Sequence, residues 1–277
     1  MTSLETLVQQ CRLLRLPSMA ECMADALKLA QQEDWPLESF LAYLLEREVV
    51  GRQQRRVERL LREAHLPAGK TLAQFDQTRL PLRLRRQLPA VIQGDFIQQA
   101  ENVLIFGQPG TGKTHLAAGL AYEWIQRDYS VWFTPTYKLV DGLLRAKRDY
   151  ELEHELKRLD RFQVVILDDI GYVQQSREEM EVLFTFLAER YERRSVVITS
   201  NLVFSQWDQI FKDPLTTAAA IDRVVHHSRI VEFGSEVTSL RAEAAARRQA
   251  QELGQDGADQ AEKAQDDLLT MGISNCR

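Results

Sequence analysis

The feature that most constrains this 277-residue chain is a glycine-rich segment between an apolar run and a helix-forming sequence. The segment Gly107–Thr114 reads Gly-Gln-Pro-Gly-Thr-Gly-Lys-Thr, and the apolar run Val103–Phe106 precedes it. A strand, a glycine turn and a helix N-terminus in this order direct backbone N–H groups toward an anion. Glycine, four residues, glycine, lysine and threonine form the pattern of a phosphate-binding P-loop. An ordinary glycine turn is the weaker alternative because the strand and the helix are both present.

The residue types within this loop suit a nucleoside triphosphate with its metal ion. The Lys113 ammonium can contact the β- and γ-phosphates, and the Thr114 hydroxyl can ligate Mg²⁺. His115 lies in the first helical turn beside the loop, where a backbone or phosphate contact and a simple, partly exposed position are both open. We therefore expect ATP and Mg²⁺ as ligands, bound by Gly107, Gln108, Pro109, Gly110, Thr111, Gly112, Lys113, Thr114 and His115.

From about residue 95, short β-branched runs alternate with helix-forming segments. Four near-continuous apolar runs predict strands that are buried on both faces, and a fifth candidate follows. Such strands with helical crossovers predict an α/β sandwich built on a parallel sheet. The five segments are Val103–Phe106, Val131–Thr134, Val164–Leu167, Val196–Thr199 and Ile230–Phe233.

Two of the predicted strands end in residues that suit a hydrolytic site. Asp168 and Asp169 follow Val164–Leu167, at the carboxyl end of a parallel strand, where ligands bind in this fold class. We expect Asp168 to hold Mg²⁺, directly or through water, and Asp169 to orient and polarise the attacking water. Asn201 would lie near the γ-phosphate if its strand sits between the other two. A strand-ending turn is the alternative for Asn201.

The N-terminal 66 residues predict a helical bundle. Apolar residues recur there at three- and four-residue steps in three stretches, which Leu16-Pro17 and Asp34-Trp35-Pro36 separate. Prolines then break the periodicity, and the far C-terminus lacks large apolar residues. We therefore expect a helical bundle over residues 1–66, a basic linker over 67–94, a nucleotide-binding core over 95–245 and a flexible tail over 246–277.

A basic stretch is concealed within the net charge of −5. Between Arg52 and Arg86 there are ten basic and three acidic residues, a local balance of +7. Such a stretch suggests a polyanion, and its side chains would contact DNA phosphates without sequence preference. A solvated helix face is the alternative for any single arginine. The candidate DNA contacts are Arg52, Arg55, Arg56 and Arg59, with Lys138, Arg145, Lys147 and Arg148 from the core.

Other features exclude some classes of protein. No apolar run approaches the roughly 18 residues of a membrane-spanning helix, and no secretory signal is visible, so we expect a cytoplasmic protein. The three cysteines, Cys11, Cys22 and Cys276, lack metal-ligand spacing. A small-molecule kinase remains a weaker alternative, because Tyr150–Arg161 does not resemble an arginine-rich lid.

Taken together, the motifs resemble those of the IstB family. IstB proteins are helper ATPases of bacterial insertion-sequence transposases, related to the DnaC helicase loader within the AAA+ group. The likeness runs from about Leu14 to Ile230 and goes beyond a generic P-loop. It is carried by Gly107–Thr114 with His115-Leu116, and by Ile166–Tyr172, Ala188–Arg193, Thr199–Leu202 and Ile221–His227.

The resemblance implies an AAA+ core whose parallel five-stranded sheet has the order 5-1-4-3-2, flanked by helices, beside a small all-α N-terminal domain. It makes Asn201 look like the sensor-1 residue and Arg223 like an arginine finger that reaches a neighbouring subunit, although spacing alone favours a solvated Arg223. Arg241 would be the sensor-2 arginine, within Thr238–Arg241 where the family usually has Ser-Tyr-Arg. Asp169 replaces the family's usual glutamate, which implies slow hydrolysis.

The resemblance also implies a function. The protein would form ATP-dependent homo-oligomers on duplex DNA, with each active site shared between subunits and hydrolysis stimulated by DNA. It would recruit or stimulate a cognate transposase during insertion-sequence transposition. A replicative helicase loader of the DnaC type is the alternative, because the same core serves both roles and the N-terminal bundle must decide between them.

Overall fold

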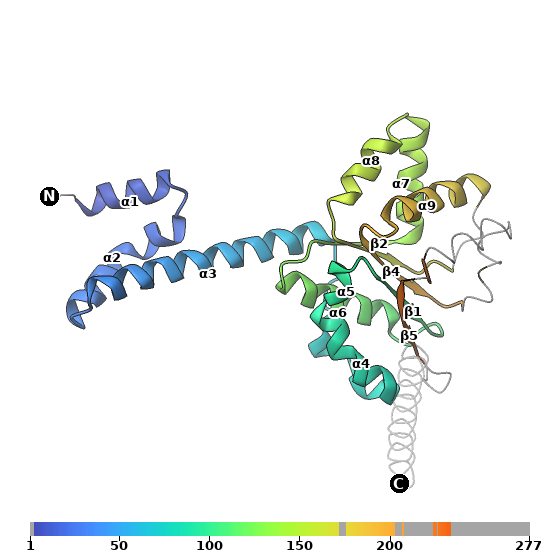
Figure 1. Ribbon diagram of the computed structural model, residues 1–277, viewed down its shortest axis with the longest axis horizontal. Coiled ribbons are helices and arrows are strands. Elements are labelled where there is room, and N and C mark those ends of the chain that lie inside the picture. Colours follow the sequence, from blue (N-terminus) through green and yellow to red (C-terminus); the bar gives the residue numbers. More distant parts are fainter. Residues whose placement is uncertain (1–2, 172–175, 203–206, 208–223, 226, 234–277) are drawn as a thin grey trace, which may run out of the picture.

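Residues 3–171, 176–202, 207, 224–225 and 227–233 are described by a computed structural model of the chain. The predicted catalytic residues Arg223 and Arg241 and the predicted tail 246–277 lie outside the described residues. The described chain consists of an N-terminal group of three helices and an α/β core, and the third helix joins them (Figure 1).

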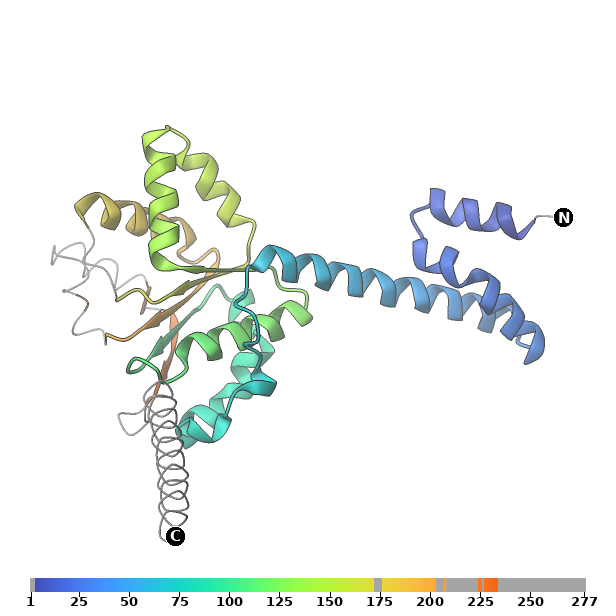
Figure 2. The ribbon, with the colours of Figure 1, turned by 180° about the vertical axis from the view of Figure 1, so that it is seen from behind.

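The N-terminal helices are α1 (Leu4–Leu13), α2 (Pro17–Gln32) and α3 (Leu37–Ala64). Prolines stand at two helix starts, where their missing N–H removes no helical hydrogen bond. Pro36 caps α3, as predicted, and Pro17, which was expected only to interrupt the periodicity, begins α2. α1 packs against α2, α2 packs along α3 as far as Arg55, and the rest of α3 extends to the core (Figure 2). The small apolar core between the three helices consists of Cys11, Met19, Ala20, Met23, Ala26 and Leu44.

A five-stranded parallel sheet forms the centre of the core. Its strands are β1 (Asn102–Phe106), β2 (Val131–Pro135), β3 (Val164–Asp168), β4 (Ser195–Ser200) and β5 (Ser228–Glu232). The strands lie in the order β2-β3-β4-β1-β5, which confirms the predicted order 5-1-4-3-2. β5 begins two residues before the predicted Ile230. β4 lies between β1 and β3, the position that the prediction for Asn201 requires.

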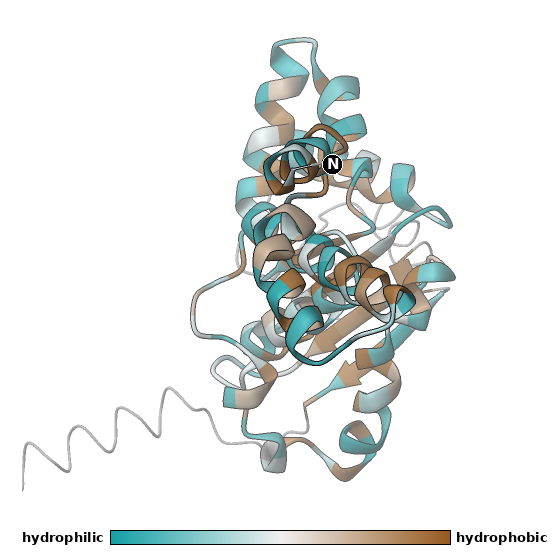
Figure 3. Cartoon of the chain, turned by 90° about the vertical axis from the view of Figure 1, so that its left-hand side faces the viewer, coloured by the Kyte–Doolittle hydropathy of each residue, from teal (hydrophilic) through white to brown (hydrophobic). Residues whose placement is uncertain are grey.

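Helices cover both faces of this sheet. Val103 and Ile105 of β1 face α4, α5 and α6, whereas Leu104 and Phe106 face α7, α8 and α9. The strands are therefore the apolar layer between more polar helices (Figure 3). Because both faces are buried, their sequences are continuous apolar runs and do not alternate between apolar and polar residues. Within the described part of the chain, no helix combines the length and the hydropathy of a membrane span. The core helices are α4 (Leu82–Gln93), α5 (Asp95–Gln98), α6 (Lys113–Gln126), α7 (Thr136–Arg148), α8 (Leu152–Asp160) and α9 (Arg177–Arg190).

The segment 67–94, expected as a linker, packs against the core instead. It contains the short helices η1 (Leu72–Gln74) and η2 (Gln77–Arg79) and the whole of α4. Pro89 lies inside α4. The helix continues through Pro89 because apolar residues at helical spacing bury one face of α4, and the Trp124 indole N–H donates to the Val91 carbonyl at 2.9 Å. The buried residues of the segment are Leu72, Phe75, Leu80, Leu84, Leu88 and Val91.

Candidate active site

The predicted P-loop connects β1 to α6, as the sequence pattern requires. Gly110 and Gly112 have φ angles of 83° and 101°, which residues other than glycine rarely adopt. Gly107 also needs to be glycine, since a Cβ there would lie 2.8 Å from the Cβ of Phe233. Among the residues that the structure describes, no side chain caps the start of α6. The loop thus leads into a helix N-terminus, which favours negative charge.

Lys113 places a positive charge within this loop. Its side chain is buried, and its Nζ donates to the carbonyls of Gly107 at 2.8 Å and of Gln108 at 3.0 Å. The Thr111 hydroxyl also donates to the Gln108 carbonyl, at 2.9 Å. These contacts hold the ammonium beside the N-terminus of α6. A phosphate group is the ligand that such an arrangement of amides and one cation fits best.

The predicted acidic pair lies at the carboxyl end of β3. The Asp168 Oδ1 accepts a hydrogen bond from the Thr199 hydroxyl at 2.7 Å, and the Asp168 carbonyl accepts one from the Thr136 hydroxyl at 3.0 Å. Asp169 has a left-handed φ of 67°, and its N–H donates to the Thr199 oxygen at 2.8 Å. Neither Thr199 nor Thr136 was predicted to have a role, because their contacts follow only from the positions of β2 and β4 on either side of β3.

Asn201 follows β4 and lies between the P-loop and the acidic pair. The Gly107 N–H donates to the Ser200 carbonyl at 3.2 Å, which ties the end of β4 to the loop. On the other side, a Cβ on Gly171 would lie 2.2 Å from the Asn201 Oδ1. This Oδ1 is buried and has no hydrogen-bond partner within the described part of the chain. A buried, unsatisfied acceptor at this place suits a water molecule or another polar ligand.

The site offers oxygen donors of the kind that Mg²⁺ prefers. Thr114 supplies a hydroxyl and Asp168 a carboxylate, and both belong to segments at the carboxyl edge of the sheet. The described residues contain no group of three or more His, Cys, Asp or Glu side chains that could hold a metal ion. Proteins usually bind Mg²⁺ through one or two side chains together with the substrate's phosphates.

His115 takes a backbone contact, one of the alternatives that its position left open. Its Nε2 lies 3.0 Å from the Thr71 carbonyl oxygen, and its ring meets the Phe75 ring edge-on at 5.4 Å between centroids. A Cβ on Gly119 would lie 2.9 Å from the Leu72 nitrogen, so η1 lies directly on α6. The imidazole therefore attaches the preceding segment to the helix of the P-loop.

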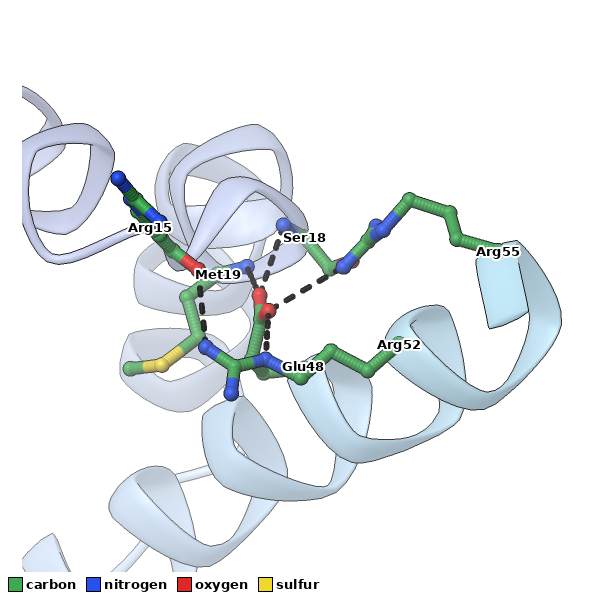
Figure 4. Close-up of polar contacts among 6 residues, drawn as sticks. All are labelled: Arg15, Ser18, Met19, Glu48, Arg52 and Arg55. Atoms are coloured by element: carbon green, nitrogen blue, oxygen red, sulfur yellow. Dashed lines mark hydrogen bonds and ion pairs between the residues drawn. The ribbon is translucent and has the colours of Figure 1, made fainter. Parts of the chain in front are cut away.

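Two of the candidate DNA contacts, Arg52 and Arg55, bind a buried carboxylate instead of lying free (Figure 4). Glu48 Oε1 accepts from Arg52 at 2.9 Å and from Arg55 at 3.2 Å, and Oε2 accepts from the N–H groups of Ser18 at 2.9 Å and Met19 at 3.1 Å. Burial acts to raise the Glu48 pKa, but the hydrogen bonds from Arg52, Met19 and Ser18 bring this pKa below its ordinary value. Glu48 thus caps α2 from α3.

The remaining candidate DNA contacts lie on the surfaces of α3 and α7. Most of them pair with an acidic neighbour, and exposed pairs of this kind are worth about 0–1 kcal/mol, so they leave the cations open to other anions. The pairs are Arg56–Asp128, Arg59–Glu63, Arg145–Asp141 and Lys147–Glu181, while Lys138 and Arg148 are exposed.

The sheet order and the P-loop, acidic pair and asparagine at one edge of the sheet define a P-loop nucleotide-binding protein with the AAA+ fold. The family model described as "IstB-like ATP binding protein" matches residues 9–246. The chain therefore belongs to the family of IstB-like ATP binding proteins.

Individual relatives agree with this assignment. A putative insertion sequence ATP-binding protein of Sinorhizobium fredii is 42% identical over 236 residues, which cover 85% of this chain and 79% of that protein. The insertion sequence IS21 putative ATP-binding protein of Pseudomonas aeruginosa is 36% identical and covers 87% of this chain and 90% of that protein.

Solved structures share the fold. The crystal structure of DnaI has a TM-score of 0.50 and 20% sequence identity, and the alignment covers 63% of this chain and 94% of DnaI. Domain III of the Thermotoga maritima replication initiation protein DnaA also has a TM-score of 0.50, with 16% identity over 61% of this chain and 68% of that domain. At these identities the comparison speaks for the fold alone.

Proposed function

We propose that the protein is a Mg²⁺-dependent ATPase that assembles on duplex DNA and assists a transposase during insertion-sequence transposition. The observation that supports the proposal is that Lys113, Asp168 and Asn201 belong to segments at the carboxyl ends of the neighbouring strands β1, β3 and β4, in a member of the IstB-like family. Names of relatives such as "insertion sequence IS21 putative ATP-binding protein" support the link to transposition.

Each residue of the site has a role in this proposal. The P-loop amides and Lys113 bind the β- and γ-phosphates, and Thr114 and Asp168 hold Mg²⁺, which when bound neutralises charge on the phosphate oxygens. Asp169 orients and polarises the attacking water, and the Asn201 side chain positions it without adding charge. Arg223 completes the active site of a neighbouring subunit, and Arg241 contacts the nucleotide, both by analogy with the family.

The hydrolytic part of this proposal is tested by phosphate release with the variant Asp169→Asn. We expect turnover to fall about 100-fold or more, the usual contribution of a general base, while ATP affinity stays unchanged. If the variant hydrolysed ATP as fast as the wild-type protein, Asp169 would have no part in hydrolysis. Addition of duplex DNA to the wild-type reaction tests whether DNA stimulates hydrolysis.

Electrostatics supports the DNA-binding part of the proposal. α7 ends in Arg145, Lys147 and Arg148, and the exposed parts of α3 carry Arg56 and Arg59. Contacts of these cations with phosphates release counterions, so the affinity for duplex DNA must fall steeply as salt rises. An affinity that does not change between low and high salt would contradict this mode of binding. Imaging with ATP, ADP or no nucleotide, with and without duplex DNA, tests for ATP-dependent oligomers.

A replicative helicase loader is the competing function, since the DnaI-like fold does not distinguish between the two roles. The names of the relatives favour transposition. A pull-down that offers the protein an insertion-sequence transposase and, separately, a replicative helicase distinguishes the two functions. Retention of the helicase alone would favour the loader.

A further inference from the structure

Asp168 is held from both sides by threonine hydroxyls, one at the start of α7 directly after β2 and one within β4. Thr136, directly after β2, donates to the Asp168 main-chain carbonyl at 3.0 Å. Thr199 of β4 donates instead to the carboxylate, with 2.7 Å between its Oγ1 and Oδ1. Both threonines are buried, so neither hydroxyl can exchange these partners freely for water. Of the two, Thr199 alone constrains the side chain that would face the metal ion.

The direction of the hydrogen bond between Thr199 and Asp168 follows from a third partner. The Asp169 N–H lies 2.8 Å from the same Oγ1 and can only donate to it. A hydroxyl has one hydrogen, and the accepted N–H occupies a lone pair, so the Thr199 hydrogen points to Asp168 Oδ1. Among the described residues no hydrogen bond engages the other oxygen, Oδ2. The carboxylate is thereby turned with one oxygen fixed and one oxygen left for a ligand.

Thr199 also holds the turn that follows Asp168. Asp169 has a φ of 67°, a left-handed conformation that costs about 1 kcal/mol or more outside glycine. The Asp169 N–H bonds the Thr199 hydroxyl, and the Ile170 N–H donates to the Thr199 carbonyl at 3.0 Å. Thr199 thus donates one hydrogen bond that sets the Asp168 carboxylate and accepts two that set the backbone of Asp169 and Ile170.

We propose that Thr199 is a positioning residue, which orients the Asp168 carboxylate toward Mg²⁺ and fixes the turn of Asp169 toward the attacking water. This inference rests on the proposed ATPase function, because it concerns the same metal ion and water. Partners of metal-binding side chains typically contribute about 10- to 100-fold to metal affinity or activity. Removing the Thr199 hydroxyl therefore weakens the binding of Mg²⁺ more than the binding of the nucleotide.

The experiment compares two variants. Thr199→Val removes the hydroxyl that contacts the Asp168 carboxylate, and Thr136→Val removes the hydroxyl that contacts the Asp168 main-chain carbonyl. The readout is the Mg²⁺ concentration that half-saturates binding of a fluorescent ATP analogue, together with the analogue's affinity in EDTA. For Thr199→Val we expect this concentration to rise about 10-fold or more, with the affinity in EDTA within about twofold of wild type. Thr136→Val should stay within about twofold in both, since Thr136 contacts only the main chain. Thr199→Ser keeps the hydroxyl and should restore the wild-type Mg²⁺ dependence.

The outcomes separate this inference from the proposed function. A wild-type protein that binds no nucleotide, or binds it without regard to Mg²⁺, contradicts the ATPase proposal and the inference with it. If nucleotide binding by the wild-type protein depends on Mg²⁺ but Thr199→Val needs the same Mg²⁺ concentration for half-saturation, the inference alone is contradicted. The same holds if Thr199→Ser needs as much Mg²⁺ as Thr199→Val. If Thr199→Val does not fold, Thr199→Cys, with a weakly donating thiol of similar size, provides the same comparison.

Discussion

The buried Glu48 should be a main source of stability for the N-terminal helices. Only 4% of this residue is exposed, and its carboxylate accepts from two backbone N–H groups at the start of α2 and from two arginines (Figure 4). Loss of a helix cap costs about 0.5–2 kcal/mol. The two arginines are about half-exposed, so each of their pairs adds only about 0.2–1 kcal/mol. We expect Glu48→Ala to lower the free energy of unfolding by about 2–3 kcal/mol.

The contribution of Glu48 to the free energy of unfolding should depend on pH. Because the folded-state pKa of Glu48 lies below its ordinary value, its contribution is present above the ordinary pKa and is lost as the pH falls through the lowered one. The difference between the wild-type protein and Glu48→Ala should therefore be constant near neutral pH and shrink in acid.

Denaturant unfolding and hydrogen exchange of the α2 amides measure this difference. Glu46→Ala, at an exposed position of the same helix, is the matched control and should change stability by less than about 0.5 kcal/mol. Equal losses for Glu46→Ala and Glu48→Ala, or a difference that grows in acid, would refute the assignment of Glu48 as the cap of α2.

Three further substitutions test other contacts. Gly171→Ala would place a Cβ 2.2 Å from the Asn201 Oδ1 and displace the amide, so we expect ATP turnover to fall about 10-fold or more with unchanged ATP affinity, measured by phosphate release and equilibrium binding. His115→Ala removes the contact with Thr71, and faster hydrogen exchange over η1 is the expected result. Arg190→Met removes the guanidinium that donates to four main-chain carbonyls, and denaturant unfolding should report a loss of about 3 kcal/mol or more.

Much of the fold could be predicted because its signals are local. The apolar runs and the glycine pattern of Gly107–Thr114 depend on neighbouring residues, and the structure has a strand, a loop and a helix where they indicate. The sheet order came from the resemblance to the IstB family and not from the runs themselves. Only that order places Asn201 between the P-loop and the acidic pair.

Contacts between residues far apart in the chain could not be predicted in the same way. The periodicity of 67–94 is interrupted by prolines, yet packing against α6 continues α4 through Pro89. Arg52 and Arg55 have the composition of a DNA-binding surface, but their partner Glu48 is buried by α2, about 30 residues away along the chain. Thr199 gains its role only through the register that aligns β4 with β3.

The central claim is that the P-loop binds a nucleoside triphosphate through Lys113. The most direct test is the ATP affinity of Lys113→Ala in the presence of Mg²⁺, with Lys157→Ala, an exposed lysine of α8, as the control. Hydrogen bonds to charged groups contribute about 1.5–3 kcal/mol, so we predict affinity to fall about 10- to 100-fold for Lys113→Ala and to stay unchanged for Lys157→Ala. Full affinity in Lys113→Ala would contradict the nucleotide site on which the proposed function depends.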